Sequence, residues 1–279
     1  MASNYSLNST IIDISQRVLN SSGSKIYDAN TDAIAANITL SNLASSETLN
    51  HSGTASIGSA NAGSYTITNL SGVSIADGSN GGLASNYTLT GGTHNFTVNQ
   101  RAISLSGTRL YDATTNAAAS DLSTMANLVG SETLTLSGTG SIASANVSSN
   151  KTVTTGTLAL ADGSNGGLAA NYTLSGGTHQ LTVNQRPLIA TLARQYDATT
   201  TAAGSDLSSF NDLQGGETLS VSGSGTATSA NVANSIAMAN NGTLALADGT
   251  GLASNYSFCL LYTSPSPRDS LSSRMPSSA

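Results

Sequence analysis

Apolar and polar residues alternate along most of the chain, and this alternation predicts β-strands. Within residues 101–185, apolar pairs separated by a single residue recur: Ile103 and Leu105, Leu134 and Leu136, Leu158 and Leu160, and Leu181 and Val183. A period of two places one set of side chains on a buried face and the other on a wet face. Glycine-rich segments such as "SGTGS" and "DGSNGG" separate these runs as turns, so we expect about six or seven short strands in this stretch.

One segment breaks the alternation. In "SDLSTMANLVG" (120–130) the apolar residues have helical spacing, Ser120 or Asp121 precedes them as an N-cap, and Gly130 follows as a stop. The segment "SDLSSFNDLQG" (205–215) repeats the pattern. We therefore predict a short helix or a 3₁₀ turn at each place.

The whole pattern returns about every 85 residues. "SETL" begins at Ser46 and again at Ser131, "GETL" begins at Gly216, and "NQR" occurs at 99–101 and at 184–186. Self-similarity at a fixed period is typical of repeat architectures. The chain is therefore a tandem array.

The phasing of these motifs defines the repeat boundaries. The predicted domains are the end of a truncated repeat (1–16), repeat 1 (17–100), repeat 2 (101–185) and a truncated repeat 3 (186–258). Because the first residues match the interior of a repeat, we expect the chain to be a fragment of a longer array.

The last residues differ from the repeat in both phase and composition. Residues 259–279 hold three of the four prolines and Cys259, the only cysteine of the chain. The text "LLYTSPSPRDS" resembles a translated sequencing adapter, so we expect a non-native, disordered tail that is excluded from fold reasoning. The alternative is a natural Ser/Pro linker.

The predicted fold class is all-β. Each unit of about 85 residues is expected to form a small β-sandwich with one short helical crossover, and a β-grasp-like unit is the alternative. Burial of the few large apolar residues of one such unit contributes a free energy that leaves only a thin margin over the entropy cost of ordering its backbone. We therefore expect no ligand pocket of several hundred Å³ inside a unit, and any binding should use outer surfaces or loops.

Charge and composition exclude several classes of partner. The net charge is −6 and only 9% of the residues are charged, which disfavours nucleic acid and anionic membrane surfaces as partners. No apolar run approaches the roughly 18 residues of a membrane span. The repeats contain no cysteine, so packing and strand pairing must hold them together without disulfides.

The tripeptide "YDA" occurs once in each repeat, after the first strand. An Asp at a strand end commonly accepts backbone N–H groups in an Asx-turn, and the preceding Tyr can bury its ring while its hydroxyl finds a partner. We interpret these residues as a structural motif and not as a reactive pair: Tyr27 and Asp28, Tyr111 and Asp112, and Tyr196 and Asp197.

The segment "ADGSNGGLA" offers a candidate calcium loop. Asp77 and Asn80, and in the next repeat Asp162 and Asn165, carry the hard oxygen ligands that calcium prefers. Six to eight oxygens are needed, however, and repeat 3 lacks the Asn. A glycine-rich β-turn is the preferred interpretation, and we expect no metal and no cofactor.

The histidines and glutamates lack the spacing that catalysis or metal binding requires. His94 and His179 occupy the same position in successive repeats, far from the spacing of metal ligands. Strand-end histidines with satisfied hydrogen bonds are the expected reading, and His51 lies elsewhere. The recurring glutamates have no paired carboxylate of the glycosidase kind: Glu47, Glu132 and Glu217. We therefore expect no enzymatic activity.

The unit resembles the YDG-type repeat of bacterial haemagglutinin-like adhesins, which include filamentous haemagglutinin and other two-partner-secretion proteins. It is also similar to the related MBG-type extracellular repeats. The resemblance depends on "YDATT", "SETLTLSGTG", "SANV", "TLALAD" and "NYTL" in this order. Alanine replaces the usual glycine of the motif in all three repeats, at Ala29, Ala113 and Ala198.

The resemblance implies a stalk or spacer segment of a large secreted or outer-membrane-associated adhesin at the bacterial cell surface. Its partners would be the neighbouring repeats of the same chain, with host glycans or surface receptors as the alternative if the exposed polar strand faces bind ligands. It implies neither nucleic-acid binding nor membrane insertion, and it carries over no catalytic or cofactor residues.

Overall fold

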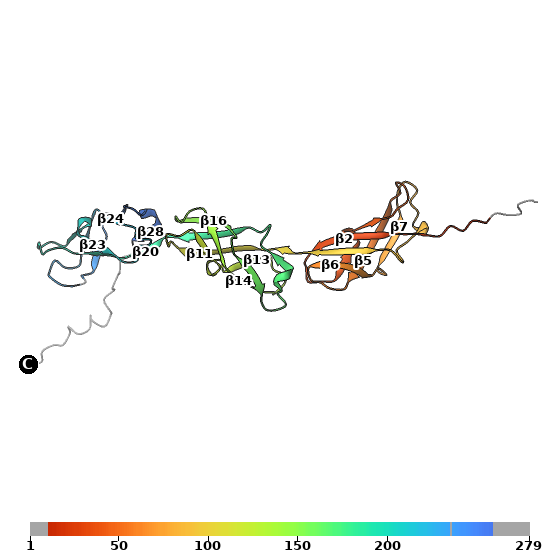
Figure 1. The fold of residues 1–279 in the computed structure, drawn as a ribbon. Helices are drawn as coiled ribbons and strands as arrows, with labels where there is room; N and C mark the ends of the chain where they lie inside the picture. The colour runs from red at the N-terminus through yellow and green to blue at the C-terminus, as the bar shows by residue number, and fades with distance from the viewer. Residues whose placement is uncertain (1–10, 235, 259–279) are drawn as a thin grey trace, which may run out of the picture. The chain divides into compact units, whose positions relative to one another are not determined.

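The structure is a computed structural model that describes residues 11–234 and 236–258. Its elements are β-strands joined by turns and by short 3₁₀ helices (Figure 1). The all-β prediction is confirmed. The predicted tail (259–279) and most of the predicted remnant (1–16) lie outside the described residues. Among the helices of the described part, none is long and apolar enough to cross a membrane.

The described residues form two compact units. The first unit contains residues 11–104, 125–137 and 159–178, and the second contains residues 105–124, 138–158 and 179–258. Repeat 2 contributes to both units, and each unit is described by itself below.

The first unit contains a mixed sheet and a separate short ladder built from repeat 1. The strands of the sheet are β2 (Asn20–Ile26), β3 (Asp32–Ile34), β4 (Ile38–Ser41), β5 (Leu49–Ile57), β6 (Gly63–Asn69), β7 (Val73–Asp77) and β9 (His94–Asn99), and the parallel ladder joins β1 (Arg17–Val18) and β8 (Tyr87–Thr88). The order in the sheet is β3-β5-β6-β9-β2-β4, and β7 pairs with β5. The first long strand, β2, runs parallel to the last, β9, with Ser21 opposite His94. The end of the repeat thus closes its sheet.

The closing strand supplies the centre of the core. In β9 the residues His94, Phe96 and Val98 are at most 5% exposed and alternate with more exposed neighbours. Leu19 and Ile67 are also buried. This is the alternation that a strand with one buried face predicts.

A glycine lets the long strand β5 pair with β7 along its first half and with β3 along its second half. Residues 49–53 pair with β7, whereas residues 54–56 pair with β3. Between them Gly53 has φ +101°, and a Cβ at this position would overlap the carbonyl oxygen of Gly72. Only glycine combines this backbone conformation with so close an approach. The equivalent residues Gly138 and Gly223 also have positive φ, at 87° and 83°.

The first unit also contains short ladders of repeat 2. β10 (Arg101–Ala102) runs parallel to β18 (Tyr172–Thr173), and β14 (Leu134–Ser137) runs antiparallel to β17 (Ala159–Asp162).

The second unit contains five of the six remaining strands of repeat 2, and the sixth, β13 (Thr124–Ala126), is divided between the two units. The five are β11 (Ser104–Leu110), β12 (Asn116–Ala118), β15 (Thr139–Ile142), β16 (Ser148–Thr154) and β19 (His179–Asn184). Their order is β12-β15-β16-β19-β11. Here β19 takes the place of β9, parallel to β11 and antiparallel to β16.

Repeat 3 is built only from short ladders. β20 (Arg186–Leu188) pairs with β28 (Tyr256–Phe258), β21 (Ala190–Leu192) with β23 (Leu207–Phe210), and β24 (Leu219–Ser222) with β27 (Ala245–Asp248). A further ladder joins β22 (Thr201–Ala203), β25 (Ser224–Ala227) and β26 (Met238–Asn240). Among the described strands of residues 186–258, none pairs with both β21 and β26, which belong to different ladders.

The prediction of an α-helix at 120–130 and 205–215 is wrong, and the alternative of a 3₁₀ turn is right. The 3₁₀ helices Ala119–Asp121 and Gly204–Asp206 are each followed by extended chain, β13 (Thr124–Ala126) and β23. Asn127 has φ 73°, which ends any right-handed helix there. Asp121 accepts the N–H of Ala118 from inside the turn and is therefore not its N-cap.

The predicted number of strands was too low. Repeat 1 contains the nine strands β1 to β9. Several of these have only two to four residues, too few for sequence alternation to reveal them.

Candidate functional site at the junctions between repeats

The "YDA" motif forms a tight turn in all three repeats. The carboxylate of its Asp accepts the N–H two residues later, at 3.1 Å for Asp28, 2.9 Å for Asp112 and 2.9 Å for Asp197. This is the Asx-turn that the sequence suggests. The alanine of each motif, at positions 29, 113 and 198, has a φ of 60° to 62°. Alanine therefore occupies a left-handed position that glycine adopts more easily.

A basic residue three positions before each Asp completes the turn. Lys25 forms an ion pair with Asp28 at 2.9 Å, and Arg109 and Arg194 pair with the equivalent carboxylates. Burial opposes ionisation of Asp28, but the hydrogen bonds from Lys25 and the N–H of Asn30 lower its pKa. The Asp is thus a carboxylate with a structural role.

The Tyr of the motif binds a carboxylate of the following repeat. Inside the first unit, the Tyr27 hydroxyl donates to Oε1 of Glu132 at 2.7 Å, and the Tyr172 hydroxyl donates to Oε2 at 2.6 Å. The Tyr172 oxygen also accepts the N–H of Val129 at 3.0 Å. The two rings meet edge to face, with centroids 5.4 Å apart. One glutamate thus joins two tyrosines from consecutive repeats.

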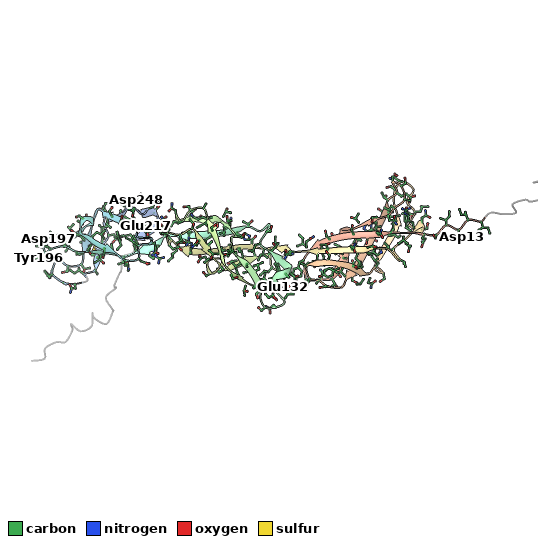
Figure 2. The ribbon with its side chains drawn as sticks, in the orientation of Figure 1. Asp13, Glu132, Tyr196, Asp197, Glu217 and Asp248 are labelled. Atoms are coloured by element: carbon green, nitrogen blue, oxygen red, sulfur yellow. The ribbon has the colours of Figure 1, made fainter. Side chains whose placement is uncertain are left out.

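The second unit contains the same arrangement around Glu217, which is labelled in Figure 2. The hydroxyls of Tyr111 and Tyr256 donate to the two carboxylate oxygens of Glu217 at 2.5 and 2.6 Å. Their rings also meet edge to face, at 5.3 Å. The cluster has therefore formed twice from equivalent residues, and we call each instance a Tyr–Glu–Tyr junction.

A buried asparagine adds a second contact to each junction. The side-chain oxygen of Asn171 accepts the N–H of Ala62 at 2.8 Å, and its amide donates to Asn61 at 3.1 Å. Asn255 forms the same pair of bonds with Val147 and Asn146. The asparagines are 0% and 1% exposed, so their polar groups are satisfied by the preceding repeat, as burial requires.

An arginine at the start of each repeat reaches back to the motif. Arg101 donates to the carbonyl oxygen of Tyr27 at 3.3 Å, and Arg186 donates to that of Tyr111 at 3.1 Å. The rest of the Arg186 guanidinium pairs with Asp212 at 2.9 Å. Each junction therefore combines aromatic, carboxylate, amide and guanidinium groups.

The first and last repeats show one half of a junction each. In repeat 1, Glu47 binds Tyr87 of its own repeat, and no second tyrosine reaches it within the described residues. In repeat 3, Tyr196 is 64% exposed, whereas Tyr27 and Tyr111 are each 3% exposed. The burial of the motif tyrosine thus depends on a following repeat.

The junction tyrosines hold their protons more firmly than a free tyrosine does. Burial, and then the hydrogen bond to Glu132, raises the pKa of Tyr27 and that of Tyr172 to about 12. Burial and Glu217 raise the pKa of Tyr256 to about 12 as well. General acids and bases work best with pKa values near the operating pH. In addition, Tyr27 and Asp28 bind different partners and do not form a reactive pair.

The candidate calcium residues are engaged with the backbone. Asp77 and Asp162 each accept a backbone N–H seven residues later, both at 2.8 Å. Asn80 and Asn165 donate to carbonyl oxygens across the turn at 3.0 and 3.1 Å. Among the described residues no group of three or more His, Cys, Asp or Glu side chains could hold a metal ion.

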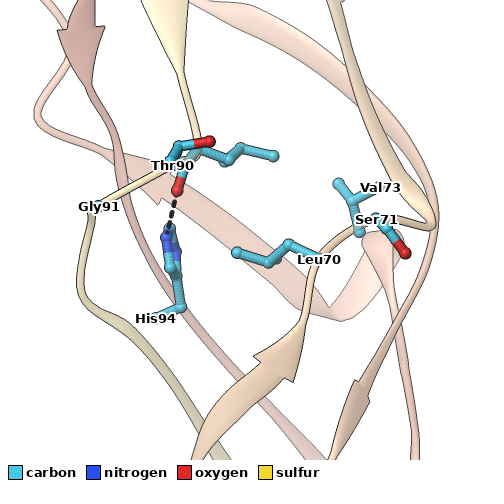
Figure 3. Close-up of a pocket in the computed structure, with 7 residues that line it drawn as sticks. Leu70, Ser71, Val73, Thr90, Gly91 and His94 are labelled. Atoms are coloured by element: carbon cyan, nitrogen blue, oxygen red, sulfur yellow. Dashed lines mark hydrogen bonds between the residues drawn. The ribbon is translucent and has the colours of Figure 1, made fainter.

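His94 is satisfied by protein atoms, as expected for a strand-end histidine. Its Nε2 lies 2.8 Å from the carbonyl oxygen of Leu89 (Figure 3) and its Nδ1 lies 2.9 Å from the Ser21 hydroxyl. Because a carbonyl only accepts, Nε2 carries the proton and Nδ1 accepts from Ser21. The ring lines an open hollow of about 470 Å³ with Leu70 and Val73. In the same repeat, His51 donates to backbone carbonyls of residues 35 and 38.

Two hollows of several hundred Å³ are open at the surface of the repeats. Besides the hollow beside His94, repeat 3 contains a groove of about 840 Å³ lined by Ala190, Leu192, Tyr196 and Met238 among others. The expectation concerned a ligand pocket inside a unit, and the count of apolar residues on which it depends gives no information on hollows at the surface.

Sequence reasoning missed the role of the glutamates. Glu132 was compared with other carboxylates, whereas its partners are tyrosines 105 and 40 residues away. The signal was present, since one Glu, one "NY" tyrosine and one "YD" tyrosine recur in every repeat with a spacing of 84 or 85 residues.

Comparison with protein families gives one match. The YDG domain matches this chain three times in tandem, over residues 15–95, 93–181 and 178–266. The comparison with curated proteins and the comparison with solved structures found no match.

Proposed function

The chain belongs to the YDG domain family, and we propose that it serves as a structural and adhesive repeat segment, a stalk or spacer, of a large secreted or surface-attached bacterial adhesin. The observation that carries this proposal is the Tyr–Glu–Tyr junction. The motif that recurs most clearly in the sequence uses its buried tyrosine to bind the next repeat. A tyrosine that recurs in each repeat and binds the following repeat suits a mechanical role.

The junction chemistry also suits exposure to changing surroundings. Each junction carboxylate accepts two hydroxyl hydrogen bonds, and bonds to a charged group contribute about 1.5–3 kcal/mol each. The contacts need neither a disulfide nor a metal ion. We propose a location outside the cell or at the outer membrane surface, which the family resemblance also implies.

Glycan or receptor binding by polar strand faces is the alternative. Many hydroxyls of these faces bind each other across the ladders, as Thr133 binds Ser164 at 2.8 Å and Ser52 binds Ser74 at 3.1 Å. Hydroxyls engaged in this way are less available to a sugar. This observation favours the spacer role, and an array of host glycans probed with the intact chain distinguishes the two, because specific signal would support binding.

Stretching single molecules tests the proposal. With the chain held at both ends, we expect repeated unfolding events that each release roughly 300 Å, the extended length of about 85 residues. Glu132→Gln should lower the unfolding force of the repeats that share this junction and leave the released length unchanged. A single event that releases the length of the whole array would contradict a chain of separate mechanical units.

A further inference from the structure

Each Tyr–Glu–Tyr junction holds two tyrosine rings in contact and directs both hydroxyls to one carboxylate. The ring centroids of Tyr27 and Tyr172 lie 5.4 Å apart with an interplanar angle of 77°. Those of Tyr111 and Tyr256 lie 5.3 Å apart at 79°. All four residues are at most 3% exposed. In each pair the hydroxyl ends of the two rings therefore converge on the same small, enclosed space.

The shared carboxylate can take the proton that oxidation of a tyrosine releases. Loss of the proton alone is unfavourable, since the pKa of Tyr27 and that of Tyr172 are raised to about 12. Removal of one electron makes a phenol strongly acidic, and the two carboxylate oxygens of Glu132 lie 2.7 and 2.6 Å from the hydroxyl oxygens. Proton transfer to a base within hydrogen-bond reach accelerates such a step. Each ring of the pair thus has its own proton acceptor.

Tyrosines outside the junctions lack this combination. The Tyr65 hydroxyl donates to the carbonyl oxygen of Asn61 at 2.7 Å, and Tyr196 is 64% exposed. Within the part of the chain that the structure describes, the ring contacts between tyrosines are those of the two junctions. An oxidant that takes electrons from every tyrosine should therefore produce adjacent radicals at the junctions.

We propose that each junction is an oxidative cross-linking site, at which a peroxide oxidises the two tyrosines and joins them by a carbon–carbon bond. Each hydroxyl loses one electron to the oxidant and one proton to the glutamate, which passes the proton to water. The two phenoxyl radicals then form a bond between ring carbons next to their oxygens. Each of these carbons releases its hydrogen as a proton, and each oxygen takes up a proton again. Two hydrogen atoms are lost overall, and the two electrons break the O–O bond of one peroxide molecule.

Such a bond would join consecutive repeats covalently in an array whose repeats contain no cysteine. A link between Tyr27 and Tyr172 encloses residues 28–171 in a loop, and a cross-link that closes a long loop stabilises a protein by constraining its unfolded chain. The cross-link adds to the stalk role but does not depend on it, because it requires only the geometry of the junction.

Photo-oxidation of the intact chain tests the proposal. Light, a ruthenium complex and persulfate supply the peroxide and a one-electron oxidant, and a dilute protein solution excludes links between molecules. Mass spectrometry of proteolytic peptides should identify one link between residues 27 and 172 and another between residues 111 and 256. Tyr65 and Tyr196 should be oxidised without forming a link within the chain.

Variants of the first junction are compared with the second junction of the same chain as an internal standard. Tyr172→Phe should abolish the link at the first junction and leave the second unchanged, whereas the control Tyr65→Phe should leave both. Glu132→Gln keeps the size of the side chain but removes the proton acceptor. In this variant the first link should form at least about tenfold more slowly, at an unchanged rate for the second.

The proposal is overturned if the folded chain forms neither link while Tyr196 is oxidised. It is equally overturned if other pairs of tyrosines link as fast as the junction pairs, or if the chain unfolded in urea gives the same links. A first link that forms at the parental rate in Glu132→Gln would refute the part assigned to the carboxylate.

Discussion

Replacing the motif alanine by glycine should stabilise the protein. Ala29 lies in the exposed "YDA" turn of repeat 1 with φ 62°. In this left-handed region the Cβ approaches the following carbonyl oxygen, which costs about 1–2 kcal/mol for a residue other than glycine. Glycine gives back about 0.4–1 kcal/mol through the greater entropy of the unfolded chain. Taking the middle of both ranges, about 1.5 and 0.7 kcal/mol, the net expected gain for Ala29→Gly is about 0.8 kcal/mol.

The three motif alanines should not gain equally. A Cβ at Gly215 would lie 2.9 Å from the Cβ of Ala113, so the Ala113 methyl group lies close to the chain of repeat 3. Ala113→Gly removes this packing along with the strain, and we expect a smaller gain than at Ala29. Ala198, with φ 61° and an exposed side chain, should behave like Ala29.

Urea unfolding of the intact chain measures the effect. The midpoint of the transition assigned to repeat 1 should rise for Ala29→Gly, with an unchanged slope. Ala76→Gly is the matched control, because Ala76 is an exposed alanine of the same repeat that lies within β7, opposite Asn50. Glycine inside a strand costs roughly 0.5–1 kcal/mol, so the control should be destabilised. If the urea midpoint falls for Ala29→Gly as it does for the control, backbone strain at the motif is refuted.

Three further changes test the junctions and the bend. Tyr27→Phe removes one hydroxyl from Glu132 and should lower the free energy of unfolding by about 1.5–3 kcal/mol in urea titrations; a loss below about 0.5 kcal/mol would show the bond to be dispensable. Gly53→Ala places a Cβ against the carbonyl oxygen of Gly72 at φ +101° and should cost at least about 2 kcal/mol, measured as a lower thermal midpoint; unchanged melting would contradict the bend. The pKa of Tyr27 and Tyr172 is raised from 10.0 to about 12, so their contribution to stability is complete below pH 10 and is lost as pH rises towards 12. Absorbance of tyrosinate should follow alkaline unfolding in that window, and full ionisation near pH 10 in the folded chain would contradict it.

The strands and the repeat period could be predicted because both depend on local pattern. Alternation of residues such as Leu181 and Val183 reflects a sheet with one buried face, and it identifies β19 without knowledge of its neighbours. The predicted helix failed because Leu122 and Met125 also suit extended chain, and a left-handed residue at 127 decided between the two conformations.

The junctions could not be predicted from local pattern. Glu132 and Tyr27 are 105 residues apart, and nothing in the neighbourhood of either residue indicates the other. The Asx-turn at Asp28 was accessible, since its partner lies only two residues away. The surface hollows were missed for a different reason, because a count of apolar residues concerns the size of a core and does not show where the chain around it leaves open space.

Each junction carboxylate takes one hydroxyl from its own repeat and one from the repeat before it. Equivalent residues fill these places at both junctions. Unequal recombination that deletes or duplicates one whole period would therefore rejoin a matching donor and acceptor. The number of repeats in such an array can therefore change by whole copies, and each new junction still contains matching tyrosines and a glutamate.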